Sequence, residues 1–174
     1  SALEGGIALL QYRRTGGSLD AARQDVALAA GFGVPVIVTD DVGLALEAGA
    51  AGAHLGRDDG DLSPARKRLA GRLLGASCYD NLTAARAAVE AGADYVAFGS
   101  VFASATKPGA VRARLSLFGE AKELGVPLAA IGGLTIGNAD QAVRAGADLL
   151  AVITDLFEAN DIRARAIQYG RLVR

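Results

Sequence analysis

The chain has 174 residues, of which 51% are hydrophobic and 21% are charged. This length suits one domain spanning residues 1–174, because it provides enough apolar side chains for one core and too few for two. The 18 basic and 19 acidic residues give a formal net charge of −1, which argues against a nucleic-acid binder with a broad basic surface. A single cysteine excludes an intrachain disulfide framework and suits a reducing compartment, so we expect a cytoplasmic protein.

The first residues, Ser1-Ala2-Leu3-Glu4-Gly5-Gly6, lack the charged and apolar regions of a signal peptide. They resemble the end of a helix that leads into a strand. Because the sequence contains no methionine, we expect a cut or processed N-terminus. No apolar run approaches the ~18 residues of a membrane span, so we expect no membrane partner.

Short, nearly continuous apolar runs indicate strands that are buried on both faces, as in a parallel sheet covered by helices. The predicted strands are Ile7–Gln11, Pro35–Thr39, Gly52–Leu55, Leu73–Ser77, Tyr95–Gly99, Leu128–Ile131 and Leu149–Thr154. The predicted helices are Leu19–Gly31, Val42–Ala48, Pro64–Ala70, Thr83–Ala91, Leu115–Leu124, Asn138–Ala145 and Leu156–Leu172, with Ser63 as one N-cap.

Alanine-glycine turns recur between these elements, at Ala48-Gly49-Ala50, Ala91-Gly92-Ala93-Asp94 and Ala145-Gly146-Ala147-Asp148. In each, glycine stands where a helix end requires a left-handed residue. Alternating strand–helix units form either an open doubly wound sheet or a closed barrel. An eight-unit barrel needs roughly 200 residues. The simplest interpretation is therefore such a barrel with its first strand and most of its first helix missing from this chain.

Polar residues follow the apolar strands at their carboxyl ends, where parallel α/β folds hold their functional groups. Asp40 and Asp41 end one predicted strand, and Asp58 and Asp59 follow the next. Neighbouring parallel strands bring such ends together, so one carboxylate from each could share Mg²⁺, which proteins hold through one or two carboxylates plus phosphates and water. The alternative is that the aspartates cap the following helices, a role that suits Asp41 before Val42.

Three further segments suit anions. Gly132-Gly133 and Ile153-Thr154 end the last two strands, where barrels often bind phosphate through backbone N–H groups; the alternative for the glycine pair is a tight turn. Ser104-Ala105-Thr106-Lys107 combines hydroxyl groups with a lysine, and Arg13 suits a bidentate phosphate contact from the opposite side. Because the net charge is near zero, we expect these individual groups and a metal ion, and not a broad basic surface, to bind the anion.

Other conspicuous side chains have structural interpretations. His54 is the only histidine and lies inside a predicted strand, where a hydrogen-bonded structural role is commoner than a catalytic one. Cys78 follows Ser77, and nothing near it indicates an activated thiolate. We expect Arg112 and Arg114 to lie on a solvated face.

At these positions the chain resembles the thiamine-phosphate synthases, from Ala2 to about Leu172. Leu10-Gln11-Tyr12-Arg13 is similar to the family's Gln-aromatic-Arg element, and Thr39-Asp40-Asp41 to its Asn-Asp-Asp element. The remaining similar segments are His54-Leu55-Gly56-Arg57-Asp58-Asp59, Tyr95-Val96-Ala97-Phe98-Gly99, Thr106-Lys107-Pro108, Ile131-Gly132-Gly133-Leu134 and Ala151-Val152-Ile153-Thr154.

The resemblance implies a (βα)8 TIM barrel and a transferase that joins hydroxymethylpyrimidine diphosphate to thiazole phosphate, releasing pyrophosphate. It implies Mg²⁺ on Asp40 and Asp59. Pyrimidine-side residues would be Gln11, Arg13, Thr39, Ser77 and Lys107, of which Arg13, Lys107 and Ser77 are the candidate catalytic residues. Thiazole-phosphate residues would be Ser104, Ala105, Thr106, Gly133, Ile153 and Thr154. Charge stabilisation of the leaving diphosphate needs no general base on the protein.

Four positions depart from the family pattern: Thr15 replaces lysine, Thr39 asparagine, Arg57 glutamine and Thr154 serine. The segment Gly16–Ala22 is also shorter than we expect for the family. Because Thr15 and Thr39 lie on the diphosphate side, one alternative is a non-catalytic relative that binds a thiamine precursor. Another is a thiazole tautomerase-like enzyme. Such an enzyme needs a proton-transfer residue, and His54 is the only candidate among the strand-end residues. The expected partners are small phosphorylated molecules, and a homo-oligomer is compatible with the sequence.

Overall fold

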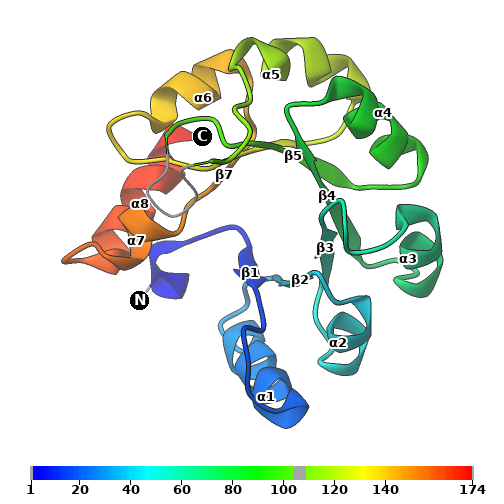
Figure 1. Cartoon of the computed structure of the whole chain (residues 1–174). Helices are drawn as coiled ribbons and strands as arrows, with labels where there is room; N and C mark the ends of the chain where they lie inside the picture. The colour runs from blue at the N-terminus through cyan, green and yellow to red at the C-terminus, as the bar shows by residue number, and fades with distance from the viewer. Residues whose placement is uncertain (1, 104–108, 174) are drawn as a thin grey trace.

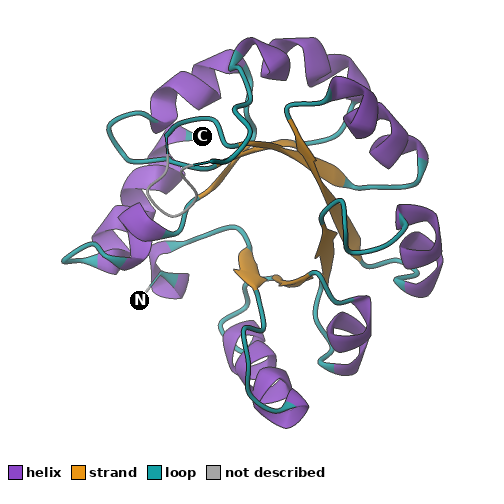
Figure 2. Ribbon diagram, viewed as in Figure 1, coloured by secondary structure: helices purple, strands orange, loops and turns teal. Residues whose placement is uncertain are grey.

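The computed structural model describes residues 2–103 and 109–173. Its parallel strands form one sheet in sequential order, and Figures 1 and 2 show the sheet curled into an arc with the helices outside. The strands are β1 Leu10–Tyr12, β2 Val36–Thr39, β3 Gly52–Leu55, β4 Leu73–Tyr79, β5 Tyr95–Gly99, β6 Leu128–Ile131 and β7 Leu149–Ala151. The order has no reversal, so the doubly wound alternative is wrong.

The α-helices are α1 Leu19–Ala30, α2 Val42–Glu47, α3 Leu62–Arg68, α4 Leu82–Glu90, α5 Ser116–Ala121, α6 Ala139–Ala145, α7 Thr154–Phe157 and α8 Ile162–Leu172. Two 3-10 turns, η1 Leu3–Gly5 and η2 Lys122–Leu124, complete the described elements. Within residues 2–103 and 109–173, no helix is long and apolar enough to cross a membrane.

Most predicted elements are confirmed, and several predicted boundaries differ from the observed ones. The first strand lies later than Ile7–Gln11, because Ile7 instead packs against the cluster of Ala2, Leu156 and Ala166. Helix α3 begins before the predicted cap Ser63, with Asp61 at its N-cap.

The last predicted strand ends at Ala151, so Thr154 belongs to helix α7. The last predicted helix is interrupted between α7 and α8, where the Asp161 side chain accepts a hydrogen bond from Ala164 N at 2.9 Å and starts α8 anew.

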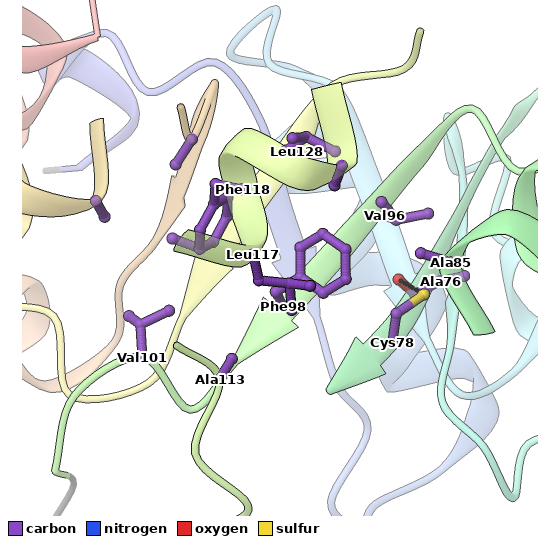
Figure 3. Close-up of a cluster of buried hydrophobic side chains, with 14 of the residues drawn as sticks. Ala76, Cys78, Ala85, Val96, Phe98, Val101, Ala113, Leu117, Phe118 and Leu128 are labelled. Atoms are coloured by element: carbon purple, nitrogen blue, oxygen red, sulfur yellow. Dashed lines mark hydrogen bonds between the residues drawn. The ribbon is translucent and has the colours of Figure 1, made fainter. Parts of the chain in front are cut away.

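The main core lies between the outer face of the sheet and the helices. Phe98 of β5 and Phe118 of α5 are fully buried and meet edge to face, with ring centroids 5.5 Å apart (Figure 3). A second cluster gathers around Val36, Val38 and Leu74, under α1 to α3. Apolar residues on successive helices thus hold each strand to its neighbour.

Two of the recurring turns form the same clamp. Gly92 and Gly146 have φ values of 95° and 114°, which confirms the predicted left-handed positions. The aspartate that follows each turn accepts a hydrogen bond from a backbone N–H at the start of the preceding strand: Asp94 from Leu74 N, the second residue of β4, at 2.7 Å, and Asp148 from Leu128 N, the first residue of β6, at 3.0 Å. Each carboxylate also pairs with a basic side chain. These clamps fix the amino ends of the strands, opposite the rim that carries the candidate site.

The edges of the described sheet are β1 and β7. Between them, η1 lies against α8 (Figure 1), and a Cβ added to Gly5 would come within 2.5 Å of Ala166 Cβ. Only glycine therefore allows this close contact between the two ends of the chain.

Candidate active site

The described candidate residues share one rim, because the carboxyl ends of parallel strands lie on one side of the sheet. Gln11 is in β1, Thr39 ends β2, Ser77 is in β4, and Gly133 and Ile153 follow β6 and β7. The predicted anion-binding residues Ser104, Ala105, Thr106 and Lys107 lie outside the described residues.

Asp40 turns off the end of β2 in an unusual conformation. Its φ is 69°, in the left-handed region, which aspartate tolerates better than most residues. Its backbone N–H donates to His54 O at 2.9 Å, and its carboxylate accepts from Arg13 Nε at 2.6 Å and from the same guanidinium's Nη2. Arg13 and β3 thus hold the carboxylate in place.

Asp59 reaches the same point from the loop after β3. Its carboxylate accepts a hydrogen bond from Gly56 N at 2.6 Å and lies within hydrogen-bonding reach of Asp40. Burial raises the pKa of Asp40, the Arg13 contact lowers it, and Asp59 raises it; the net effect is a pKa above the ordinary value. Both carboxylates line an open pocket of about 310 Å³.

This carboxylate pair fits a hard divalent cation. Two adjacent carboxylates repel each other, and a bound cation would relieve that repulsion. Within residues 2–103 and 109–173 no group of three or more His, Cys, Asp or Glu side chains could hold a metal ion. Asp40 and Asp59 alone could hold Mg²⁺ only as two carboxylate ligands, with water and substrate phosphate completing its shell.

The other two aspartates differ in role. Asp41 accepts a hydrogen bond from Leu44 N at 2.8 Å and caps α2, which confirms the capping alternative for this residue. Asp58 is exposed. Of the four aspartates, Asp41 is thus a helix cap and Asp58 is solvated, whereas the carboxylates of Asp40 and Asp59 lie close together.

A hydrogen-bonded chain crosses the inside of the sheet, and its two central members, His54 and Tyr95, are buried. Gln11 Nε2 donates to the Tyr95 hydroxyl at 3.1 Å, the hydroxyl meets His54 Nδ1 at 2.9 Å, and His54 Nε2 meets Ser77 Oγ at 2.8 Å. If the hydroxyl donates to Nδ1, His54 carries its own proton on Nε2 and donates to Ser77.

Gly75 makes room for this chain. A Cβ there would lie 2.1 Å from Tyr95 Cζ and 2.5 Å from His54 Nδ1. The sequence did not predict the role of Tyr95, which resembled an ordinary core residue of its strand. The available signal was its hydroxyl group, because a buried tyrosine hydroxyl usually has a hydrogen-bond partner.

His54 is held as a neutral structural group. It is 5% exposed, and burial lowers its pKa to about 4, with the charge of Asp59 acting in the opposite direction. Both ring nitrogens have partners, as expected for a structural histidine and unlike a free proton-transfer group. Cys78 is likewise buried, and burial raises its pKa to about 12. A reactive thiolate is therefore excluded at this position.

The glycine pair after β6 is required by close contact with the neighbouring loop. Gly133 has φ 64°, and a Cβ there would lie 2.3 Å from Ala103 O; a Cβ on Gly132 would lie 2.3 Å from Ser100 Oγ. The next strand end exposes Ile153, at 69%, and Thr154. The structure therefore places Gly133 in the loop after β6, and Ile153 and Thr154 at the N-cap and first residue of α7, after the neighbouring strand β7.

The arginines outside the pair occupy other environments. Arg57 lies over the Tyr79 ring, 4.6 Å from its centroid. Arg114 pairs with Glu120, and Arg112 donates to Val101 O at 3.3 Å, which fits the expected solvated face.

Comparison with known proteins decides the family. Residues 1–156 match the family described as thiamine monophosphate synthase. The chain belongs to this family. It is 55% identical over 177 residues to the thiamine-phosphate synthase of Aromatoleum aromaticum, covering 98% of this chain and 85% of that protein. Identity to the thiamine-phosphate synthase of Chromobacterium violaceum is 53% over 171 residues, covering 95% and 83%.

A solved structure agrees with the family membership. The thiamine phosphate pyrophosphorylase from Pyrococcus furiosus superposes with a TM-score of 0.88 at 29% identity, covering 99% of this chain and 85% of the other. The family resemblance drawn from the strand-end motifs is thereby confirmed, and the curled parallel sheet is the fold of the family.

Proposed function

We propose that the chain is a thiamine-phosphate synthase, which joins hydroxymethylpyrimidine diphosphate to thiazole phosphate and releases pyrophosphate. The observation that carries the proposal is the convergence of Asp40, Asp59 and Arg13 on one rim, in a chain 55% identical to a protein of that name. The same rim holds Gly133 and Ile153, which suit a second phosphorylated substrate.

The diphosphate side is built around the carboxylate pair. Asp40 and Asp59 would hold Mg²⁺, which when bound neutralises charge on the diphosphate and helps it depart. Arg13, which hydrogen-bonds to the Asp40 carboxylate, would stabilise the leaving group from the protein side. Lys107 supplies a second cation in this proposal. Thr15 leaves this side one cation short of the family pattern, a charge that Arg14 or Arg57 could replace.

The pyrimidine lies beside Gln11, Thr39 and Ser77 in this proposal. Diphosphate departure breaks the bond between the pyrimidine methylene carbon and oxygen and leaves a ring-stabilised cation, which the thiazole nitrogen captures through its lone pair. No protein base takes part. The Tyr95–His54 pair supports this side, because it fixes Gln11 and Ser77 through hydrogen bonds of 3.1 and 2.8 Å.

The thiazole phosphate lies across the rim, against the backbone of Gly133 and the exposed start of α7 at Ile153 and Thr154. Ser104, Ala105 and Thr106 join this side in the proposal. Backbone N–H groups and hydroxyls suit a phosphate without a large basic surface. Holding both substrates close while excluding water is the remaining contribution of the protein.

The architecture proposed for the whole enzyme is a (βα)8 TIM barrel built as one domain. The support is that β1 and β7 are sheet edges and η1 already packs on α8, so one further βα unit from outside residues 1–174 would close the ring. A cytoplasmic location agrees with the single buried thiol. Homo-oligomers stay a prediction.

The test is turnover by the purified chain. Both phosphorylated substrates and Mg²⁺ are supplied, and thiamine phosphate is measured by fluorescence after oxidation to thiochrome phosphate. We expect product in proportion to enzyme and one pyrophosphate per product. Binding of thiazole phosphate without product, in the folded chain, would instead support the non-catalytic alternative. The tautomerase alternative has little support, because both nitrogens of His54 are occupied.

A further inference from the structure

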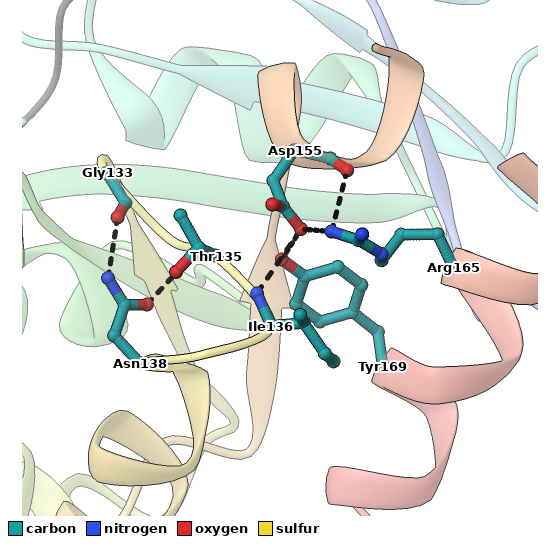
Figure 4. Close-up of polar contacts among 7 residues, drawn as sticks. All are labelled: Gly133, Thr135, Ile136, Asn138, Asp155, Arg165 and Tyr169. Atoms are coloured by element: carbon teal, nitrogen blue, oxygen red, sulfur yellow. Dashed lines mark hydrogen bonds and ion pairs between the residues drawn. The ribbon is translucent and has the colours of Figure 1, made fainter. Parts of the chain in front are cut away.

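Two loops must be held together for the proposed thiazole-phosphate side to work. One follows β6 and contains Gly133; the other follows β7 and leads through Ile153 into Thr154, the first residue of α7. They belong to different βα units; pairing of β6 with β7 places the strand ends, and side chains connect the segments beyond them (Figure 4).

Asn138 fixes the first loop internally. Its Oδ1 accepts from Thr135 N at 2.8 Å, and its Nδ2 donates to Gly133 O at 3.0 Å (Figure 4). The carbonyl of Gly133 is therefore tied to Asn138, the N-cap of α6.

Asp155 connects that loop to the second one. Its carboxylate accepts from Ile136 N at 3.2 Å, in the loop after β6, and from the Tyr169 hydroxyl at 2.6 Å, in α8. It also pairs with Arg165 of α8 (Figure 4). The side chain is 19% exposed. One carboxylate thus joins α7, α8 and the loop that carries Gly133.

The carboxylate is stabilised in its charged form. Burial raises the pKa of Asp155, but hydrogen bonds from Arg165, Tyr169 and Ile136 outweigh burial and lower it below the ordinary value. Asp155 directly follows Thr154, where an unpaired negative charge would repel a phosphate. The ion pair with Arg165 removes that conflict and leaves Asp155 free to act as a connector.

We propose that Asp155 is a positioning residue that holds the Gly133 loop and the Ile153–Thr154 turn at the spacing that binds thiazole phosphate. This inference rests on the proposed function. It assigns α8 a part in substrate affinity although that helix supplies no group to the substrate.

The experiment compares Asp155→Asn with Asp148→Asn in the full chain. Asp148 is a matched control, because it also accepts a backbone hydrogen bond, from Leu128 N, and pairs with Lys122, but lies at the amino ends of the strands. Steady-state KM is measured for each substrate, and thiazole phosphate binding is measured by calorimetry without the second substrate. For Asp155→Asn we expect the thiazole-phosphate KM and Kd to rise about ten-fold. The pyrimidine-diphosphate KM and kcat should stay within two-fold.

The control should leave both KM values within two-fold. A thiazole-phosphate KM unchanged in Asp155→Asn, or an equal rise in both KM values, would overturn the inference. Tyr169→Phe keeps the inference testable if Asp155→Asn is unstable, because it removes only one hydrogen-bond donor to Asp155. We expect the thiazole-phosphate KM and Kd to rise selectively, by about three-fold. A wild-type chain that binds thiazole phosphate yet makes no product would contradict the proposed function while leaving the binding comparison valid.

Discussion

The single histidine makes stability depend on pH in a defined window. Burial lowers the pKa of His54 to about 4 in the folded state, against about 6.5 in an unfolded chain. Between these values the unfolded state binds a proton that the folded state does not. Stability is therefore complete above pH ~6.5 and falls as the pH drops towards ~4.

The expected loss can be calculated from these two values. Proton linkage gives a decrease in the free energy of unfolding of ~1.5 kcal/mol between pH 6.5 and pH 5. Most carboxyl groups of an unfolded chain titrate near pH ~4, below this interval. Asp40, whose pKa is raised, acts in the opposite direction, so its contribution must be removed by comparison.

The assay is urea denaturation at both pH values for the wild-type chain and for His54→Asn, which has no imidazole. Each protein gives a change in the free energy of unfolding between the two pH values, which is its pH slope. The wild-type slope minus the His54→Asn slope is the contribution of His54 and should equal the calculated loss. Because the chain has one histidine, its long-range 15N spectrum reports that ring alone and should show the Nε2–H form at pH 6. Equal slopes, or an imidazole that titrates near pH ~6.5 in the folded chain, would refute the reasoning.

Three substitutions test other contacts. Asp41→Ala removes the cap of α2, and we expect a loss of about 1 kcal/mol in urea denaturation; a loss below about 0.3 kcal/mol would show that the cap is unimportant. Asp94→Ala removes a backbone acceptor and an ion pair at the amino end of β5, with an expected loss of about 2 kcal/mol by the same measurement; near-neutral behaviour would argue against the clamp. Gly75→Ala places a Cβ 2.1 Å from the Tyr95 ring, and we expect a loss of about 2 kcal/mol with a shifted His54 15N spectrum, whereas an unchanged spectrum would contradict the packing.

Strands buried on both faces were predictable because their apolar runs are bounded by glycine or proline. The strand at Gly52–Leu55 has the predicted bounds, and so has Tyr95–Gly99. The first strand was misplaced because Ile7 is equally apolar but serves the contact with α8. Local pattern does not distinguish a residue that joins the sheet from one that packs beside it.

The rim was predictable for a topological reason, since parallel strands bring Asp40 and Asp59 to one side whatever the details of the fold. The groups that support the rim were not. Tyr95 contacts His54, 41 positions away, and Asp155 contacts residues 10 to 19 positions away. Such hydrogen bonds depend on the three-dimensional arrangement, and no spacing in the sequence indicates them.

The claim that most needs measurement is that Asp40 and Asp59 bind a magnesium-loaded diphosphate. Calorimetry with pyrophosphate, with and without Mg²⁺, tests it on the wild-type chain, Asp40→Asn, Asp59→Asn and the capping control Asp41→Asn. We predict Mg²⁺-dependent binding in the wild type and the control, and at least ten-fold weaker binding in the other two. Binding that is independent of Mg²⁺, or equally strong in all four proteins, would contradict the assignment.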